Sequence, residues 1–359
     1  MATALVPGQV VAGRYRVERL IGEGGMGAVY LVQHVHTDEQ LAMKVLHAQV
    51  LKDENAVERF RREARAPARV QSEHVARVTD ADTAPELGGA PFYVMEYLRG
   101  RDLDEVVRAH GAMPPATVVQ YLRQAARALD KAHGMGIVHR DLKPENLFLT
   151  QREDGTPCIK LLDFGIAKLA GGELPAQLKT QSGAVFGTPA YMSPEQTRGE
   201  VDRIGPPSDV WAFGLIAYKL LTARDYWTAQ IIAQLYVEIL SSPIVPPSAR
   251  GAAFGPAFDA WFCRCVSREI EGRFASAGEA VQELAAALGI EAPRGSMASI
   301  VEVAHSPSGP QGTAMLPPSR PPAPIPGTTT PPTAQDARPA ASGGTGRIVA
   351  IALVLLTLA

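Results

Sequence analysis

The feature that most constrains this chain of 359 residues is a run of eight, His139-Arg-Asp-Leu-Lys-Pro-Glu-Asn146. Within it, Asp141, Lys143 and Asn146 bring a carboxylate, a cation and an amide oxygen into one short loop. A carboxylate can accept a hydroxyl proton, a cation can stabilise a moving phosphate, and an amide oxygen can bind Mg²⁺. A polar turn before the strand-like run Leu147–Leu149 is the alternative, and so complete a pattern disfavours it. The loop therefore indicates phosphoryl transfer.

A glycine-rich segment near the start of the chain, Gly22-Glu-Gly-Gly-Met-Gly27, fits the spacing G-x-G-x-x-G. Glycines allow backbone N–H groups to approach phosphate oxygens closely. A dinucleotide site uses the same spacing but continues into a helix, whereas here Ala28-Val-Tyr30 continues with residues typical of a strand. The context predicts a strand–turn–strand lid over a nucleotide.

Lys44 lies in the apolar strand-like segment Leu41–Leu46, 17 residues after Gly27. A lysine is seldom buried without a partner, so we expect an acidic residue on the helix predicted to follow, over residues 53–70. On that helix Glu63 flanks the buried stripe of Val57, Phe60 and Ala64, while Glu58 lies nearly opposite it. Glu63 is the predicted partner of Lys44.

Pro67 complicates this pair. A proline inside a helix clashes with the carbonyl four residues earlier, which here belongs to Glu63, at a cost of about 3 kcal/mol. The helix is therefore expected to end or kink there, and the effect on the pair of Lys44 and Glu63 is left open.

A second acidic motif, Asp163-Phe-Gly165, follows the apolar run Ile159–Leu162 and lies 17 residues after Asn146. A carboxylate at the end of a strand, beside a flexible Phe-Gly pair, can hold Mg²⁺ against phosphates. A bare turn is the alternative, and the order and spacing of the motifs favour the metal ligand.

Strand-like segments come first in the chain and helical segments later. The predicted strands are Tyr15–Ile21, Ala28–Val32 and Leu41–Leu46. Helical spacing relates the apolar residues between Val118 and Leu129, and a capping box of Ser276 with Glu279 opens a helix that runs through Leu288. This order predicts an α+β fold with a small β-rich lobe and a larger helical lobe. The net charge of −2 argues against a nucleic-acid partner.

The composition changes near Gly289. Residues 289–346 contain 12 prolines and are predicted to form a disordered, Pro-rich linker. Residues 348–359 form an uncharged apolar segment, and a bilayer span needs about 20 residues. We expect this segment to be part of a truncated transmembrane helix, with Arg347 at its cytoplasmic edge. A short tail that inserts shallowly or packs on another surface is the alternative.

Together these motifs resemble the protein kinase family, and in particular the eukaryotic-like (Hanks-type) serine/threonine kinases of bacteria. The similarity covers about Tyr15–Leu288. It implies a bilobal protein kinase fold with an N-lobe at residues 15–95 and a C-lobe at residues 99–288, preceded by an N-terminal extension, residues 1–14.

The resemblance also implies roles for the residues of the two acidic motifs. Asp141 matches the catalytic residue that accepts the hydroxyl proton, and Lys143 is the residue that serine/threonine kinases place beside it. Asn146 and Asp163 match the Mg²⁺ ligands, with Mn²⁺ as an alternative metal.

For ATP, the resemblance assigns Lys44 to the phosphates and Glu63 to its support. The backbone groups of Glu96 and Leu98 would face adenine in the interlobe hinge, with Met95 at the gatekeeper position. The loop over ATP would consist of Ile21, Gly22, Glu23, Gly24, Gly25, Met26, Gly27, Ala28 and Val29.

A later segment, Gly187–Glu195, resembles the part of these kinases that docks a polypeptide substrate. Ser193 stands there in place of the usual alanine. Glu195 with Arg273, and separately Asp209, match residues that hold the loops in place and take no part in the chemistry.

The function implied is transfer of the γ-phosphoryl group of Mg-ATP to Ser/Thr hydroxyls of proteins, in bacterial signal transduction. Protein substrates, self-association for autophosphorylation and membrane attachment through the C-terminal segment would follow, with the kinase domain in the cytoplasm and tethered to the inner membrane. A non-catalytic pseudokinase would be expected to lack Lys44, Asp141 or Asp163, and all three are present. A kinase for a small metabolite is disfavoured by the docking segment.

Regulation can be inferred from Arg140, a cation directly before Asp141 that we expect to be buried and in need of an anion. Thr180 and Ser182 lie in the polar segment between Phe164 and Gly187. The hypothesis is that autophosphorylation of one of them supplies the anion and orders the segment. Both hydroxyls remain candidates for this modification.

Overall fold

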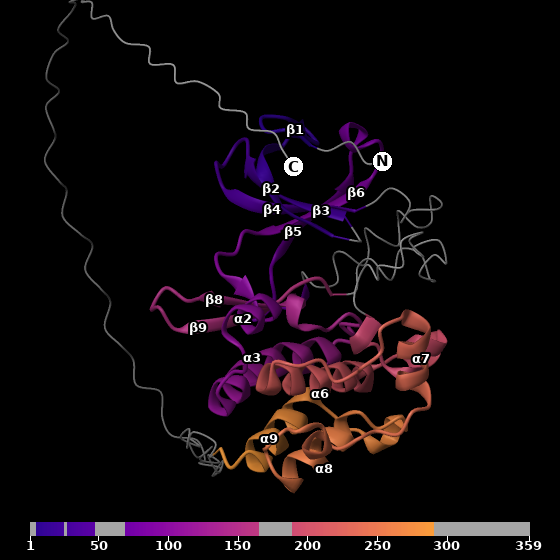
Figure 1. The fold of residues 1–359 in the computed structure, drawn as a ribbon. Helices are drawn as coiled ribbons and strands as arrows, with labels where there is room; N and C mark the ends of the chain where they lie inside the picture. Colours follow the sequence, from indigo (N-terminus) through magenta and orange to yellow (C-terminus); the bar gives the residue numbers. More distant parts are fainter. Residues whose placement is uncertain (1–4, 25–26, 47–68, 165–188, 291–359) are drawn as a thin grey trace, which may run out of the picture. The chain divides into compact units, whose positions relative to one another are not determined.

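The computed structural model describes residues 5–24, 27–46, 69–164 and 189–290, all within one compact unit that spans Met1–Met297. Its first part, the N-lobe, is an antiparallel sheet with the strand order β1-β2-β3-β4-β6-β5 (Figure 1). The strands are β1 (Val10–Val11), β2 (Tyr15–Gly24), β3 (Gly27–His34), β4 (Gln40–Leu46), β5 (Val78–Thr83) and β6 (Pro91–Glu96).

Strand β6 explains why both faces of this sheet are apolar. Phe92 and Val94 belong to one buried cluster, whereas Tyr93 and Met95 belong to another. Successive side chains of a strand point to opposite faces, so a strand that is apolar throughout fills a core on each side. The cluster that contains Tyr93 also includes Ala42 of β4 and lies next to the candidate site.

The second part, the C-lobe, is mainly helical and carries a small antiparallel sheet, β7-β8-β9 (Figure 1). Its strands are β7 (Arg101–Asp102), β8 (Leu147–Gln151) and β9 (Pro157–Leu161). Its helices are α2 (Leu103–His110), α3 (Pro115–His133), α5 (Pro194–Arg198), α6 (Pro206–Thr222), α7 (Ile232–Leu240), α8 (Pro256–Cys265) and α9 (Ala277–Ala287).

Helix α6 forms the centre of the C-lobe. All its residues from Ser208 to Tyr218 are buried, which is typical of a helix that is covered on every side. Helix α3 presents to the same core the stripe predicted from helical spacing between Val118 and Leu129. The C-lobe core thus forms a rigid base below the loop that carries Asp141.

The α+β prediction is confirmed, and the predicted strands lie within β2, β3 and β4. The predicted capping is confirmed in part: Ser276 accepts a hydrogen bond from the Glu279 N–H, but the Glu279 carboxylate accepts from the Ala275 N–H. Residues before Tyr15 contribute to the fold, because β1 pairs with β2 and Val11 is buried.

Several predictions concern residues outside the described ranges. These are the helix that carries Glu63 and Pro67, the segment with Thr180 and Ser182, the Pro-rich linker beyond Ile290 and the apolar segment 348–359. Among the described helices, none has both the length and the hydropathy needed to cross a membrane.

Candidate active site

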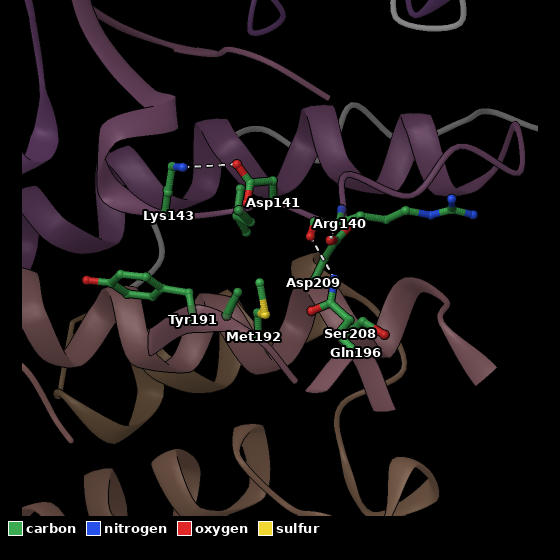
Figure 2. Close-up of a pocket in the computed structure, with 10 residues that line it drawn as sticks. Arg140, Asp141, Lys143, Tyr191, Met192, Gln196, Ser208 and Asp209 are labelled. Atoms are coloured by element: carbon green, nitrogen blue, oxygen red, sulfur yellow. Dashed lines mark hydrogen bonds and ion pairs between the residues drawn. The ribbon is translucent and has the colours of Figure 1, made fainter. Parts of the chain in front are cut away.

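The loop between α3 and β8 places the predicted catalytic residues side by side. The Lys143 ammonium lies 3.0 Å from a carboxylate oxygen of Asp141 (Figure 2). Asn146 donates from its side-chain nitrogen to the Asp141 backbone oxygen at 2.7 Å and to the same carboxylate oxygen at 3.3 Å. Desolvation opposes the charge of Lys143, but the Asp141 carboxylate outweighs it and raises the pKa of Lys143. The two residues therefore form a charged pair.

A buried carboxylate fastens the backbone of this loop. Asp209 at the start of α6 accepts from the His139 N–H at 2.8 Å and from the Arg140 N–H at 2.9 Å. Its second contact at Oδ2 is the His133 ring nitrogen at 2.7 Å. Hydrogen bonds to a buried carboxylate are stronger than those between neutral groups, so these contacts hold the backbone of the two residues before Asp141 in place. The structural role predicted for Asp209 matches this geometry.

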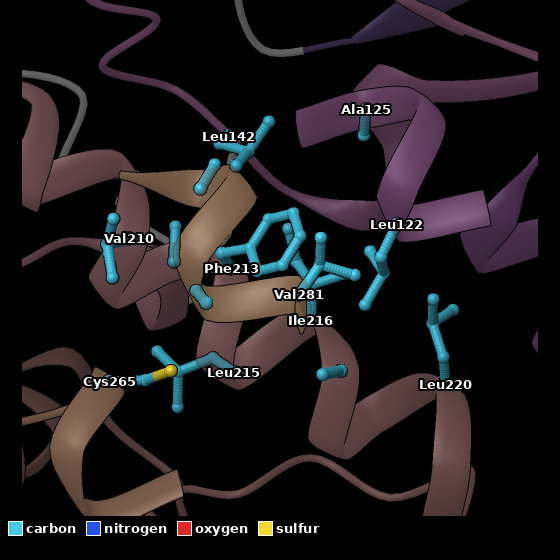
Figure 3. Packing of buried hydrophobic residues seen from close by; sticks show 14 of the residues in the cluster. Leu122, Ala125, Leu142, Val210, Phe213, Leu215, Ile216, Leu220, Cys265 and Val281 are labelled. Atoms are coloured by element: carbon cyan, nitrogen blue, oxygen red, sulfur yellow. The ribbon is translucent and has the colours of Figure 1, made fainter. Parts of the chain in front are cut away.

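The apolar residue of the loop, Leu142, packs into the C-lobe core. Leu142 belongs to the same buried cluster as Val210 and Phe213 of α6 (Figure 3). Asp141 and Lys143, on either side of it, each keep 17% of their side-chain surface exposed. The loop thus buries its apolar side chain and leaves the two charged ones accessible.

His139 orders the loop through its ring. The Asp141 N–H donates to His139 Nδ1 at 3.3 Å, and His139 Nε2 lies 2.9 Å from the Leu162 backbone oxygen. Burial lowers the pKa of His139, so the ring is neutral and carries its proton on Nε2. The ring therefore links the loop His139–Asn146 to the residue that precedes Asp163.

A backbone hydrogen bond brings the two predicted metal ligands together. The Leu162 N–H donates to the Asn146 carbonyl oxygen at 2.9 Å, and Asp163 is the next residue after Leu162. Because the Asn146 side-chain nitrogen makes the contacts to Asp141, its oxygen is the atom suited to a cation. A carboxylate and an amide oxygen fit a hard divalent cation that takes its other ligands from phosphates and water. Among the described residues, no cluster of three or more His, Cys, Asp or Glu forms a metal site.

Asp163 joins the two lobes. One carboxylate oxygen contacts the Lys44 ammonium from β4, and the other accepts a hydrogen bond from the Tyr93 hydroxyl of β6. Burial would raise the pKa of Asp163, but the Lys44 charge and these hydrogen bonds outweigh it and lower that pKa. Asp163 is therefore ionised and contacts side chains from two strands of the N-lobe, β4 and β6.

A pocket next to Asp141 is lined by residues 140–143 of the loop, by Tyr191, Met192 and Gln196, and by the first turns of α6 (Figure 2). Gln196 of α5 donates to the Arg140 backbone oxygen at 2.7 Å and so ties this segment to the loop. Ser193 caps α5 and forms a capping box with Gln196. The spacing Ser-x-x-Gln is itself a capping signal, so the sequence could have predicted this cap.

The predicted pair of Glu195 and Arg273 is present, and it is buried. Arg273 donates to both oxygens of Glu195 at 2.7 and 2.9 Å, and the side chains are 0% and 2% exposed. Burial alone would raise the pKa of Glu195, but Arg273 and Ser208 outweigh it and lower that pKa to about 2. This pair holds α5 against the base of the C-lobe.

The two strands predicted on either side of the glycine-rich turn are present, because β2 and β3 pair up to Gly24 opposite Gly27. A Cβ on Gly27 would lie 2.0 Å from the Val45 backbone oxygen, so this position requires glycine. A Cβ on Gly22 would meet nothing within 4 Å, so contacts within the described protein do not require glycine there. Gly25 and Met26 lie outside the described residues, as does Glu63.

The remaining residues of the predicted loop, Ile21, Glu23, Ala28 and Val29, lie on β2 and β3. Val29 packs against the buried cluster of Ala42, Leu46, Ala81, Tyr93 and Met95. The cluster gives the N-lobe an apolar surface beside the strand that ends in the hinge.

In the hinge, the Glu96 N–H donates to the Arg77 backbone oxygen at 3.0 Å, and the Glu96 carboxylate lies 2.8 Å from the Lys160 ammonium of β9. Leu98 follows the end of β6. Sequence reasoning missed the contribution of Lys160, because a pair that joins residues far apart in the chain leaves no local signal.

Arg140, the residue directly before Asp141, was expected to be buried and is half-buried.

Comparisons with known proteins agree with this geometry. A family described as "Protein kinase domain" matches residues 15–259. Two relatives from Myxococcus xanthus, serine/threonine-protein kinases Pkn1 and pkn3, are 40% and 38% identical over 74% and 78% of this chain. These matches span 37% and 51% of the relatives' own lengths, so the chain spans about half or less of the curated relatives it matches. The crystal structure of a double mutant of the Mycobacterium tuberculosis PknI kinase domain aligns with a TM-score of 0.64 at 27% identity, covering 80% of this chain and 100% of that one.

Proposed function

Because its residues 15–259 match the protein kinase domain, the chain belongs to the protein kinase family, and we propose that it transfers the γ-phosphoryl group of ATP to serine or threonine hydroxyls of proteins. The observation that carries this proposal is the meeting of Lys44, Asp141 and Asp163, which come from three distant segments. Lys44 contacts Asp163, whose neighbour Leu162 is hydrogen-bonded to Asn146, which in turn contacts Asp141.

In this proposal Asp141 accepts the proton of the acceptor hydroxyl. The hydroxyl oxygen forms a bond to the γ-phosphorus while the bond from that phosphorus to ADP breaks, and the proton passes to the carboxylate. Lys143 lies 3.0 Å from the same carboxylate and can stabilise the phosphoryl group during transfer. The pocket lined by Tyr191 and Met192 lies directly beside this carboxylate and is suited to an acceptor side chain.

Protein kinases use ATP with a divalent metal ion, and the oxygen ligands offered by Asn146 and Asp163 suit Mg²⁺, with Mn²⁺ as an alternative. When bound, the ion neutralises charge on the phosphates. Lys44 would hold the phosphates from the N-lobe, with Glu63 as its support. The segment from Ile21 to Val29 would cover ATP.

We assign adenine to the apolar surface formed by Val29, Ala42 and Met95. The Glu96 N–H is already hydrogen-bonded to Arg77, so the carbonyl of Glu96 and the backbone of Leu98 are the hinge groups proposed to bind the base.

Three finer parts of the proposal rest on sequence alone. Autophosphorylation at Thr180 or Ser182 would activate the protein, and self-association would allow one copy to modify another. Residues 348–359 would attach the chain to the inner membrane and leave the kinase domain in the cytoplasm. Phosphopeptide mapping after incubation with ATP should find one of the two hydroxyls modified, and its failure to do so would reject the activation step.

The activity is tested with the full chain, radiolabelled ATP and MgCl₂, together with unstructured peptides that carry Ser, Thr or Tyr as their sole hydroxyl residue. We expect label on the Ser or Thr peptides and none on the Tyr peptide. Omission of the divalent metal should abolish the labelling. Transfer to Tyr alone, or to no peptide while ATP is bound, would contradict the proposal.

A further inference from the structure

A buried tyrosine hydroxyl next to the metal-binding carboxylate has no role in the activity as proposed so far. Tyr93 on β6 is 1% exposed, and its neighbours in the buried cluster are apolar: Ala42, Leu46, Ala81 and Met95. A phenylalanine would fill the same space, so packing does not explain the oxygen. A buried hydroxyl is unfavourable unless it has a hydrogen-bond partner.

The partner of this hydroxyl is Asp163. Tyr93 donates to one oxygen of the carboxylate, and the Lys44 ammonium contacts the other. Lys44 and Tyr93 face each other as partners in the pairing of β4 with β6, and the Lys44 nitrogen lies 5.9 Å from the centre of the Tyr93 ring. One pair of adjacent strands therefore positions both donors to Asp163.

Asp163 depends on such contacts for its orientation. Its backbone φ is +53°, in the left-handed region that residues other than glycine seldom adopt. It follows the end of β9, so no strand pairing directs its side chain. Contacts from the N-lobe thus determine where the carboxylate points.

The two donors differ in chemistry. A carboxylate oxygen has two lone pairs, so an oxygen that accepts from Tyr93 can still bind a cation. The ammonium of Lys44 repels an approaching cation, whereas the neutral phenol orients the carboxylate without adding positive charge. Hydrogen bonds of this kind to a ligating carboxylate contribute to metal affinity.

We propose that Tyr93 is a positioning residue for the divalent metal: its hydroxyl holds the Asp163 carboxylate in the orientation that binds the ion. The inference rests on the proposed function, in which Asp163 is a metal ligand. It assigns to the hydroxyl a role that the apolar residues on the same face of the sheet cannot fill.

The test compares the full chain with its variant Tyr93→Phe, which retains the ring and loses the hydroxyl. Binding of Mn²⁺ in the presence of a non-hydrolysable ATP analogue is followed by the electron paramagnetic resonance signal of the free ion. We expect about 10-fold weaker Mn²⁺ binding in the variant, and a similar rise in the Mg²⁺ concentration that gives half-maximal activity at saturating ATP. Binding of the analogue without metal should be unchanged.

Tyr121→Phe, which alters a buried tyrosine of α3 in the C-lobe core, is the matched control and should bind Mn²⁺ as the unaltered chain does. Tyr93→Met, an apolar and adaptable replacement, should reproduce the defect of Tyr93→Phe. Unchanged Mn²⁺ affinity in a folded Tyr93 variant would overturn the inference and leave the proposed function intact. Absence of binding of both Mn²⁺ and the analogue by the unaltered chain would instead count against the proposed function.

Discussion

In the C-lobe half of the site, backbone N–H groups of the catalytic loop are fastened to the buried carboxylate of Asp209, whereas in the N-lobe half the long side chain of Lys44 reaches out from the sheet to Asp163. The first half is held by short contacts between buried groups. The second is held where two side chains meet, and Lys44 keeps 14% of its side-chain surface exposed. We therefore expect changes to the buried contacts of the C-lobe to lower stability, and changes to Lys44 to lower activity.

The largest expected effect is on turnover, from Asp141→Asn. Loss of the proton acceptor should lower kcat by about 10²–10⁴-fold, because general-base catalysis contributes that much. ATP binding should be retained, since the carboxylate acts on the acceptor hydroxyl. Steady-state kinetics and ATP-analogue binding measure the two quantities. Asp154→Asn, the same change in an exposed turn, should leave both unchanged; equal turnover in the two variants would refute the role of Asp141.

The next effect is on stability, from Arg273→Met in the buried ion pair of the C-lobe. Removal of one partner of a buried ion pair leaves the Glu195 charge uncompensated and should lower the free energy of unfolding by about 3–5 kcal/mol. Arg264→Met removes an exposed pair with Glu279, 46% and 38% exposed, and should cost about 1 kcal/mol or less. Urea unfolding at pH 7 measures both. Similar losses in the two variants would show that burial does not set the difference.

The stability contributed by the pair of Glu195 and Arg273 should fall in acid. The pKa of Glu195 is about 2 in the folded chain and 4.5 ordinarily, so the folded state binds this proton less readily than the unfolded state. The contribution of the pair is therefore complete above pH 4.5 and is lost as the pH falls toward 2, by about 3 kcal/mol in total. Urea unfolding between pH 6 and pH 3 should show this loss. In Glu195→Gln the slope over that range should be smaller, and an unchanged slope would contradict the assignment.

The smallest effect in free energy is expected from the N-lobe half. Lys44→Met should lower kcat/KM by about 100-fold, because one charged contact to the phosphates is lost. The midpoint of thermal unfolding should stay close to that of the unaltered chain, because neither sheet pairing nor the core depends on the ammonium. Lys131→Met, on an exposed part of α3, is the control for both measurements. A large fall in stability would show that Lys44 stabilises the fold, and it would contradict the contrast between the C-lobe and N-lobe halves of the site.

The parts of the site that could be predicted are those formed by residues close together in the sequence. The loop His139–Asn146 and the motif at Asp163 each place chemically distinctive groups at fixed spacing, and the strand that follows Gly27 distinguished this segment from a dinucleotide site. The helical stripe of α3 was visible because its spacing repeats over several turns. Local periodicity and local chemistry leave a signal in a single sequence.

Other contributions had weak signals or none. Ser193 caps α5, and its partner Gln196 three residues on could have revealed this. The hydroxyl of Tyr93 could not have been predicted, because the strand segment Pro91–Glu96 reads as an ordinary buried strand whatever the tip of that side chain contacts. The same is true of Lys160, whose partner Glu96 lies 64 residues away.

The chemical groups that the chain can bring to a phosphate follow from its amino-acid sequence, because their types and spacing are local properties. Which of these groups meet depends on how the strands and helices pack. The pairing of β4 with β6 placed Tyr93 beside Lys44, and the packing of β9 brought Asp163 to both. The reason is physical: a hydrogen bond between residues 70 positions apart depends on how strands and helices pack, and no pattern of neighbouring residues encodes it.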